Sequence, residues 1–281
     1  MKKSRSNISL KNTNNKILSI QFSLDGFSFC VSDLFSKEIS YFADYTFDET
    51  LNSLENLLEN IKTIFNEDPI LHNEFSEVFI IHQNNLNTLV PDDYFDENSL
   101  SSYLEYNIKT LQTDFITFDF IAEIEAKNVY IPYVNINNYL FQNFGEFEYK
   151  HHTTILLEKL IQKNKSEEKV MFVNVFKNTF DVVVLEHKKL ILSNSFAYKT
   201  KEDFIYYILF VAEQLQLDNE EFKLYFTGEI TINSDLYKIA FTYIKNVYFL
   251  ELFHVVQTFL KQIDLLVLQF LELSEDYLKL E

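Results

Sequence analysis

Residues 170–196, VMFVNVFKNTFDVVVLEHKKLILSNSF, contain three apolar runs separated by two short polar turns. The runs are rich in valine, leucine and phenylalanine, and β-branched and aromatic residues between turn signals are typical of strands. The turns fall at Lys177-Asn178 and His187-Lys188. The stretch therefore predicts three consecutive strands joined by tight turns. These strands are Val170–Phe176, Thr179–Glu186 and Lys189–Phe196.

The residues that follow predict a helix and then a buried strand. Thr200 and Asp203 open a helix from about Lys201 to Leu215, because a hydroxyl at the N-cap and an acidic residue in the first turn favour helix initiation. One face of this helix is apolar. Residues 221–227 then predict a further strand.

The same order of elements occurs about 150 residues earlier in the chain. A capping box at Thr46 and Glu49 predicts a helix from Phe47 to about Phe65, with leucine, isoleucine and phenylalanine on one face. The strands predicted around it are Ile17–Ser23, Phe27–Asp33, Glu38–Ala43 and Glu77–His82.

Two copies of strand, strand, strand, helix and strand predict an α/β protein with two similar domains, each a mixed sheet carrying helices. We place the first domain at residues 1–150 and the second at 151–281, and interpret the repetition as an internal duplication. The alternative is coincidence, because hairpins followed by helices are common.

Composition limits the possible partners. The formal net charge of −18 disfavours binding to nucleic acid or to an anionic membrane surface, and makes a basic protein segment the more plausible partner. Cys30 is the single cysteine, so an intramolecular disulfide and a cysteine-based zinc site are excluded. A polar stretch follows the basic N-terminal residues where a signal peptide would be apolar, which favours the cytoplasm.

The segment from Tyr248 to Leu273 predicts an apolar helix that is buried either between the two domains or against a second subunit, as in a homodimer. Charged residues interrupt it, so we do not expect it to span a membrane.

At this level the layout resembles the actin-like ATPase superfamily of sugar kinases, heat-shock chaperones and actin. It is more similar to a bacterial family with an actin-like fold and no assigned activity. The 170–196 stretch and the later Tyr225-Phe226-Thr227-Gly228 also look like the pilus-assembly protein family PilM. The resemblance implies two ribonuclease H-like, actin-type domains with ATP and magnesium in the cleft between them.

The phosphate-loop positions that this resemblance implies are altered. In the first loop Gln21 stands in place of an aspartate, Ser23 in place of a glycine and Leu24 in place of a hydroxyl residue. In the second loop Asn174 replaces the aspartate and Phe176 a glycine. An aspartate positions magnesium or water, and glycines let backbone N–H groups approach phosphate. The resemblance therefore implies a degenerate nucleotide site.

Three residues remain as candidate cofactor-binding positions if a nucleotide is bound. Lys177 offers a positive charge in the second phosphate loop, with a lysine at a solvated hairpin tip as the alternative interpretation. Thr227 and Gly228 fall at the adenosine motif that the resemblance implies. The next residue, Glu229, would repel nucleotide phosphates. We identify no catalytic residue and no metal ligand.

Other polar residues predict ordinary structural roles. We expect Asp181 at a strand edge, and Asp203 in the first turn of a helix, where a carboxylate favours the helix dipole. His151-His152, with Glu148 nearby, could bind a metal, but the spacing favours a solvated loop pair. His254 is interpreted as a partly buried residue of the C-terminal helix.

The sequence favours a non-catalytic actin-like protein that acts as a protein-interaction or scaffold module. The alternative is a divergent ATP-binding ATPase or kinase that uses the interdomain cleft. A metal-dependent hydrolase is a third possibility without a supporting motif. The three glycines of the chain agree with the first hypothesis, because Gly228 alone falls at an expected nucleotide position.

Overall fold

A computed structural model describes residues 1–5, 15–36, 38–111 and 113–250. The described chain forms two compact units, the first from Met1–Phe120 and Ala126–Lys159, the second from Ile121–Glu125 and from Leu160 onward. Most of the predicted C-terminal helix, including His254, lies outside the described residues. Among the described residues, no helix combines the length and the apolar character needed to cross a membrane.

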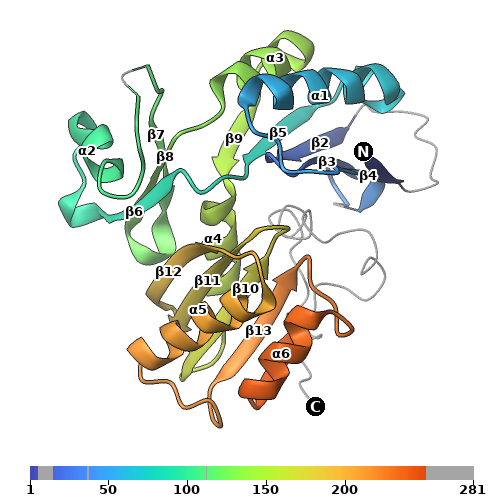
Figure 1. Cartoon of the computed structure of the whole chain (residues 1–281). Helices are drawn as coiled ribbons and strands as arrows, with labels where there is room; N and C mark the ends of the chain where they lie inside the picture. The colour runs from blue at the N-terminus through green and yellow to red at the C-terminus, as the bar shows by residue number, and fades with distance from the viewer. Residues whose placement is uncertain (6–14, 37, 112, 251–281) are drawn as a thin grey trace. The chain divides into compact units, whose positions relative to one another are not determined.

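The first unit contains a six-stranded mixed sheet in the order β1-β4-β3-β2-β5-β9 (Figure 1). Helices α1 (Leu54–Glu67) and α3 (Val134–Phe144) pack on one face, where Leu57, Ile61 and Ile136 join the apolar side chains of the strands. The 3-10 turn η1 (Pro69–His72) follows α1. The strands are β1 (Lys2–Arg5), β2 (Lys16–Phe22), β3 (Gly26–Asp33), β4 (Ile39–Thr46), β5 (Glu77–His82) and β9 (Glu148–His151).

An insertion between β5 and α3 forms a separate three-stranded sheet in the order β6-β8-β7. Its two ends lie side by side, because the Ile131 N–H donates to the carbonyl oxygen of Leu86 at 3.0 Å. The short helix α2 (Leu100–Leu104) contributes the buried Leu104 to an apolar cluster with Val90 and Val129. The other elements are β6 (Asn87–Pro91), η2 (Asp92–Tyr94), η3 (Glu97–Ser99), β7 (Thr117–Ile121), η4 (Ala122–Ile124) and β8 (Ala126–Tyr130).

The second unit contains a five-stranded mixed sheet in the order β12-β11-β10-β13-β14. Helices α5 (Lys201–Gln214) and α6 (Asp235–Tyr243) pack on one face of it, and Thr200 and Asp203 form the predicted capping box of α5 (Figure 1). The strands are β10 (Lys169–Val175), β11 (Thr179–Glu186), β12 (Lys189–Ala197), β13 (Lys223–Gly228) and β14 (Asn246–Phe249). Helix α4 (His152–Lys163) precedes them.

The two sheets have equivalent topology. In each, the first strand is antiparallel to the second and parallel to the fourth, so β2, β3 and β5 correspond to β10, β11 and β13. The predicted mixed α/β class is thus confirmed, with strand bounds within three residues of those expected. A shared origin by duplication remains a prediction, because equivalent topology does not by itself establish descent.

The predicted start of the first helix was wrong. Helix α1 begins at Leu54 with Ser53 as its N-cap, and not at Phe47 after Thr46. Thr46 instead ends β4, where it pairs with Gly26 of β3 and with Lys2 of β1. Pairing on both sides of β4 therefore overrides the local capping pattern at Thr46 and Glu49.

Candidate functional site

The candidate site in the second unit is a row of polar residues across four adjacent strands. Asn174 of β10 lies opposite Asp181 of β11 and beside Thr227 of β13, and Asp181 lies opposite Ser195 of β12. The Ser195 hydroxyl donates to Asp181 Oδ1 at 2.5 Å, and Asn174 Nδ2 donates to Oδ2 at 3.5 Å. Both Asn174 and Asp181 are buried. The row thus holds one carboxylate that accepts from a hydroxyl and from an amide.

The expectation that Asp181 lies at a strand edge was wrong, because Asp181 lies within an inner strand of the sheet. Strand β11 runs between β10 and β12, so Asp181 is flanked on both sides. Its valine neighbours, Val182 and Val184, face the helices, while Asp181 itself points to the opposite face with Val183. This position and the row that it joins could not be derived from the local sequence.

The hairpin after β10 is closed by its own hydrogen bonds. The Phe176 N–H donates to the Thr179 carbonyl oxygen at 2.9 Å, and the Phe176 carbonyl oxygen accepts from the Tyr198 hydroxyl at 2.7 Å. The Phe176 side chain is buried. Lys177 is half-buried at the turn, next to Asn178. The bulky side chain therefore occupies space that a glycine would leave open.

Gly228 is required by the backbone itself. Its φ is +82°, and a Cβ atom there would lie 2.2 Å from the Val175 carbonyl oxygen and 2.7 Å from Asn174 Oδ1. The next N–H, of Glu229, donates to that same Val175 oxygen at 2.6 Å. A side chain is excluded by this close approach of β13 to β10. The glycine thus has a structural explanation that needs no nucleotide.

The equivalent position in the first unit holds a pair of amides. Gln21 of β2 corresponds in register to Asn174, and its Nε2 donates to Gln83 Oε1 at 2.5 Å. Both side chains are buried. Gln83 follows β5, and its N–H donates to Phe22, as that of Glu229 does to Val175. The two amides are joined by this hydrogen bond and add no charge at the end of the strand.

The turn after β2 is similarly filled. Ser23 Oγ accepts from the Asp25 N–H at 3.1 Å, and the Leu24 carbonyl oxygen accepts from the Leu51 N–H at 2.7 Å. The Leu24 side chain packs against the apolar core of the unit. The turn is therefore part of the structural core of the first unit.

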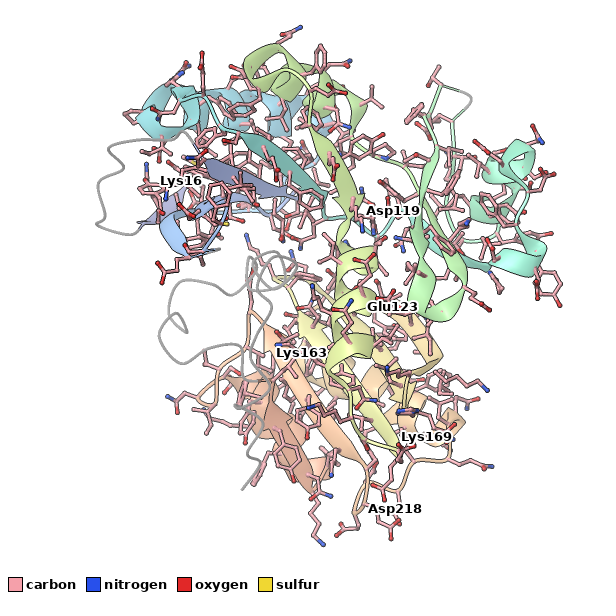
Figure 2. All side chains as sticks on the ribbon, turned by 180° about the vertical axis from the view of Figure 1, so that it is seen from behind. Lys16, Asp119, Glu123, Lys163, Lys169 and Asp218 are labelled. Carbon is pink, nitrogen blue, oxygen red and sulfur yellow. The ribbon has the colours of Figure 1, made fainter. Side chains whose placement is uncertain are left out.

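A buried polar network at the start of α4 was missed by the sequence reasoning. Its centre is Asp119 of β7, which Figure 2 labels. Oδ2 of Asp119 accepts from the His151 N–H at 2.9 Å and from the Thr154 hydroxyl at 2.7 Å. Oδ1 accepts from the Tyr130 hydroxyl at 3.1 Å. Asn128 Nδ2 also donates to the Thr154 hydroxyl at 2.9 Å. Burial raises the pKa of the Asp119 carboxyl, and the three donors oppose that shift. The only local signal was an acidic residue within the strand sequence Phe-Asp-Phe.

The interpretation of His151 and His152 as a solvated pair was wrong. Both are buried, and their rings lie 4.5 Å apart. His151 Nδ1 accepts from the Thr153 N–H at 3.2 Å, which leaves Nε2 to donate to Asn84 Oδ1 at 3.2 Å. Burial holds the pKa of His151 well below its usual range. Within the described ranges, no cluster of three or more His, Cys, Asp or Glu side chains could hold a metal ion.

His82, at the end of β5, is a second fully buried histidine of this unit. Its Nδ1 accepts from the Tyr133 N–H at 3.2 Å and its Nε2 lies 2.9 Å from Asn137 Oδ1. Burial lowers the pKa of His82 from 6.5 to about 3. The imidazole is therefore neutral at physiological pH and joins β5 to the start of α3.

These features define a class of protein with two mixed sheets of equivalent topology, with buried amides at the equivalent strand ends. A protein from Bacteroides thetaiotaomicron described as having an actin-like ATPase fold and unknown function is similar to this chain, with a TM-score of 0.79 and 23% identity over 92% of this chain and 97% of its own. A structure of the PilM-PilN type IV pilus biogenesis complex matches with a TM-score of 0.54 and 11% identity, over 90% of this chain and 96% of the matched chain. The chain therefore has the actin-like ATPase fold.

Residues 5–247 match the family model described as protein of unknown function (DUF3822), and the chain belongs to that family. No curated protein matches the sequence. The resemblance to an actin-like bacterial family is confirmed by these matches.

Proposed function

We propose that this chain is a protein-interaction module built on an actin-like fold and that it does not hydrolyse ATP. The observation that carries the proposal is the buried Gln21–Gln83 pair, with its 2.5 Å hydrogen bond. It occupies the strand end at which the fold family carries an aspartate for magnesium or water. Magnesium prefers anionic oxygen ligands, and a pair of mutually bonded amides offers none.

The groups of ATP do not fit the residues at the other expected positions. Phosphate binding needs backbone N–H groups that can be approached closely, which is the usual role of glycines in such loops. Here Leu24 packs into the core and Phe176 is buried, while Gly228 accommodates the backbone of Val175. Lys177 and Thr227 remain, and a single cation with one hydroxyl does not replace two phosphate loops and a metal ion.

The structural comparisons agree with a role in protein binding. One protein of this fold, PilM, is found in a complex with PilN. At 11% identity this match shows the fold alone. It supports the proposal by showing that an actin-like fold of this size is compatible with assembly onto another protein.

Calorimetry with ATP and magnesium tests the proposal on the whole chain. We expect no binding with a Kd below about 1 mM, which corresponds to about −4 kcal/mol. Micromolar binding that is lost in a Lys177→Ala, Thr227→Ala double variant would establish the ATP-binding alternative instead. Lys188→Ala, at the opposite end of the sheet's hairpins, is the matched control. The second arm is crosslinking in the native cell, where we expect a specific protein partner.

A further inference from the structure

The insertion between β5 and α3 exposes an unusual number of large apolar side chains. Of the fifteen exposed large hydrophobic side chains in the described residues, five lie in the insertion, which is much less than a third of the chain. Tyr94 is 77% exposed and Tyr106 91% exposed. Monomeric surfaces rarely gather such side chains unless they bind something. The five are Tyr94, Tyr106, Leu111, Phe115 and Phe120.

The same segment of the chain is acidic. Residues 92–114 carry six acidic side chains and one basic side chain, Lys109. Five of the six are exposed and Asp114 is half-buried. A potential of this sign attracts cations and repels nucleic acid and anionic lipid. The five exposed ones are Asp92, Asp93, Asp96, Glu97 and Glu105.

Next to these residues lies an aromatic platform in which the half-buried rings of Phe95, Tyr103 and Phe118 contact one another, and Lys127 links the exposed ring of Phe120 to them. The Phe95 ring stacks on Tyr103 with centroids 6.1 Å apart and meets Phe118 edge-on at 4.7 Å. The Tyr103 hydroxyl donates to the Tyr94 carbonyl oxygen at 2.7 Å, which fixes η2 against α2. The platform therefore joins η2, α2 and β7 into one surface.

The chain already places one cation on this platform. Lys127 Nζ lies 3.7 Å from the centroid of the Phe120 ring and 5.6 Å from that of Phe95. The same ammonium group is 2.9 Å from Asp92 Oδ1. Phe120 remains 48% exposed and the Asp92 side chain 47% exposed, so ring and carboxylate area is left at the surface. The rings and carboxylates together have the chemistry that binds lysine and arginine side chains.

We propose that the exposed rings and exposed carboxylates described above form one acidic aromatic face of the insertion, and that this face docks a basic segment of another protein. Arginine or lysine side chains of that segment lie over the exposed rings and beside the carboxylates. The inference rests on the proposed function, because it locates the partner of the same interaction module. The negative charge of this face favours a basic occupant. The exposed rings add apolar contact area to the interaction.

The test uses the full chain and a short, fluorescent, extended peptide in which arginine alternates with valine, with a glutamate–valine peptide as counterpart. The variant is Asp93→Lys, Tyr94→Ala, Glu97→Lys, which removes one exposed ring and reverses two exposed charges. We expect the arginine peptide to bind about tenfold more weakly to this variant, from the summed loss of a cation–π contact and two exposed charge pairs. Binding to the parent chain should weaken with added salt.

A matched control makes the same change of charge and ring on α5, as Glu202→Lys, Tyr206→Ala, Glu213→Lys. All three residues are exposed. We expect the control to bind the arginine peptide within about twofold of the parent chain, because its changes leave every residue of the proposed face in place. Thermal unfolding of both variants verifies that they fold.

Equal binding by the insertion variant and the parent would overturn the proposal, as would an equal loss in the α5 control or tight binding of the glutamate peptide. Titrating ATP into the same samples separates the two conclusions. ATP binding would refute the proposed function while leaving the peptide result to judge the docking face. If the insertion variant binds the arginine peptide as the parent does and ATP does not bind, the docking face alone is refuted.

Discussion

Gly228 illustrates how a single residue can match a family motif for a purely structural reason. Its positive φ and the approach of the Val175 carbonyl oxygen both exclude a side chain. Gly228 is the last residue of β13, which is parallel to β10. The chain turns away sharply there, and the Ile230 N–H donates to the Gly228 carbonyl oxygen at 2.9 Å. A glycine at this point is therefore a requirement of the sheet.

We expect Gly228→Ala to lower the free energy of unfolding by about 3 kcal/mol, from left-handed strain together with the contact at Val175. Gly145→Ala is the matched control. Gly145 also has a positive φ, of 75°, but nothing lies within 4 Å of its added Cβ. It should cost about 1 kcal/mol. Urea unfolding measures both, and equal losses would contradict the role given to the close approach.

At the scale of elements, Asp119 and the insertion fix the start of helix α4. The Asp119 carboxylate accepts hydrogen bonds from the His151 N–H, from the Thr154 hydroxyl and from the Tyr130 hydroxyl. The polar face of the three-stranded sheet thus meets α4 through hydrogen bonds, while its apolar face packs under α2. Interfaces of this kind depend on full satisfaction of their polar atoms.

Asp119→Ala should lower the free energy of unfolding by about 3–5 kcal/mol, because buried donors lose their acceptor. Asp119→Asn should cost about 1 kcal/mol, since its oxygen can accept from His151 and Thr154 while its amide donates to the Tyr130 hydroxyl oxygen. Denaturant unfolding compares the two. A small loss of unfolding free energy in Asp119→Ala would contradict this prediction, because it would show that water replaces the carboxylate as acceptor.

The elements themselves were largely predictable, and the contacts between their ends were not. The runs at Thr179–Glu186 and Glu77–His82 gave the strand bounds found in the structure, because apolar residues between turn signals leave little choice. The helix start predicted from the capping pattern at Thr46 was wrong, because Thr46 pairs with the neighbouring strand β3. The Gln21–Gln83 pair joins residues 62 positions apart, and no local pattern encodes such a partner.

For the whole molecule, buried neutral histidines make stability sensitive to acid. The folded pKa of His82, about 3, lies below that of an unfolded histidine, 6.5, so the unfolded chain binds the proton more readily. Stability is therefore full above about pH 6.5 and falls as the pH drops toward 3. Burial of His151 lowers its pKa in the same direction and adds to the effect.

We expect the free energy of unfolding to fall by about 1.4 kcal/mol per pH unit for each such histidine below pH 6. His82→Asn, whose amide oxygen can accept from the Tyr133 N–H, should make this slope shallower by about one proton. Asn137→Ser removes the partner of His82 but keeps the titrating ring, so it should lower stability without flattening the slope. An unchanged slope in His82→Asn would contradict the assignment.

The insertion leaves the first unit and returns to it at a single point, where Ile131 pairs with Leu86 and Asn84 Nδ2 donates to the Ile131 carbonyl oxygen at 3.2 Å. Residues 87–130 are thus a module joined to the rest of the first unit at this junction and, through Asp119, at the start of α4. A chain in which a short glycine-containing turn replaces them loses the Asp119 acceptor of the His151 N–H. We therefore expect the six-stranded sheet to form with a lower free energy of unfolding, even where Thr154→Val removes the hydroxyl that Asp119 and Asn128 would otherwise satisfy. The same junction makes the module transplantable, so that its surface could be grafted between adjacent strands of an unrelated scaffold.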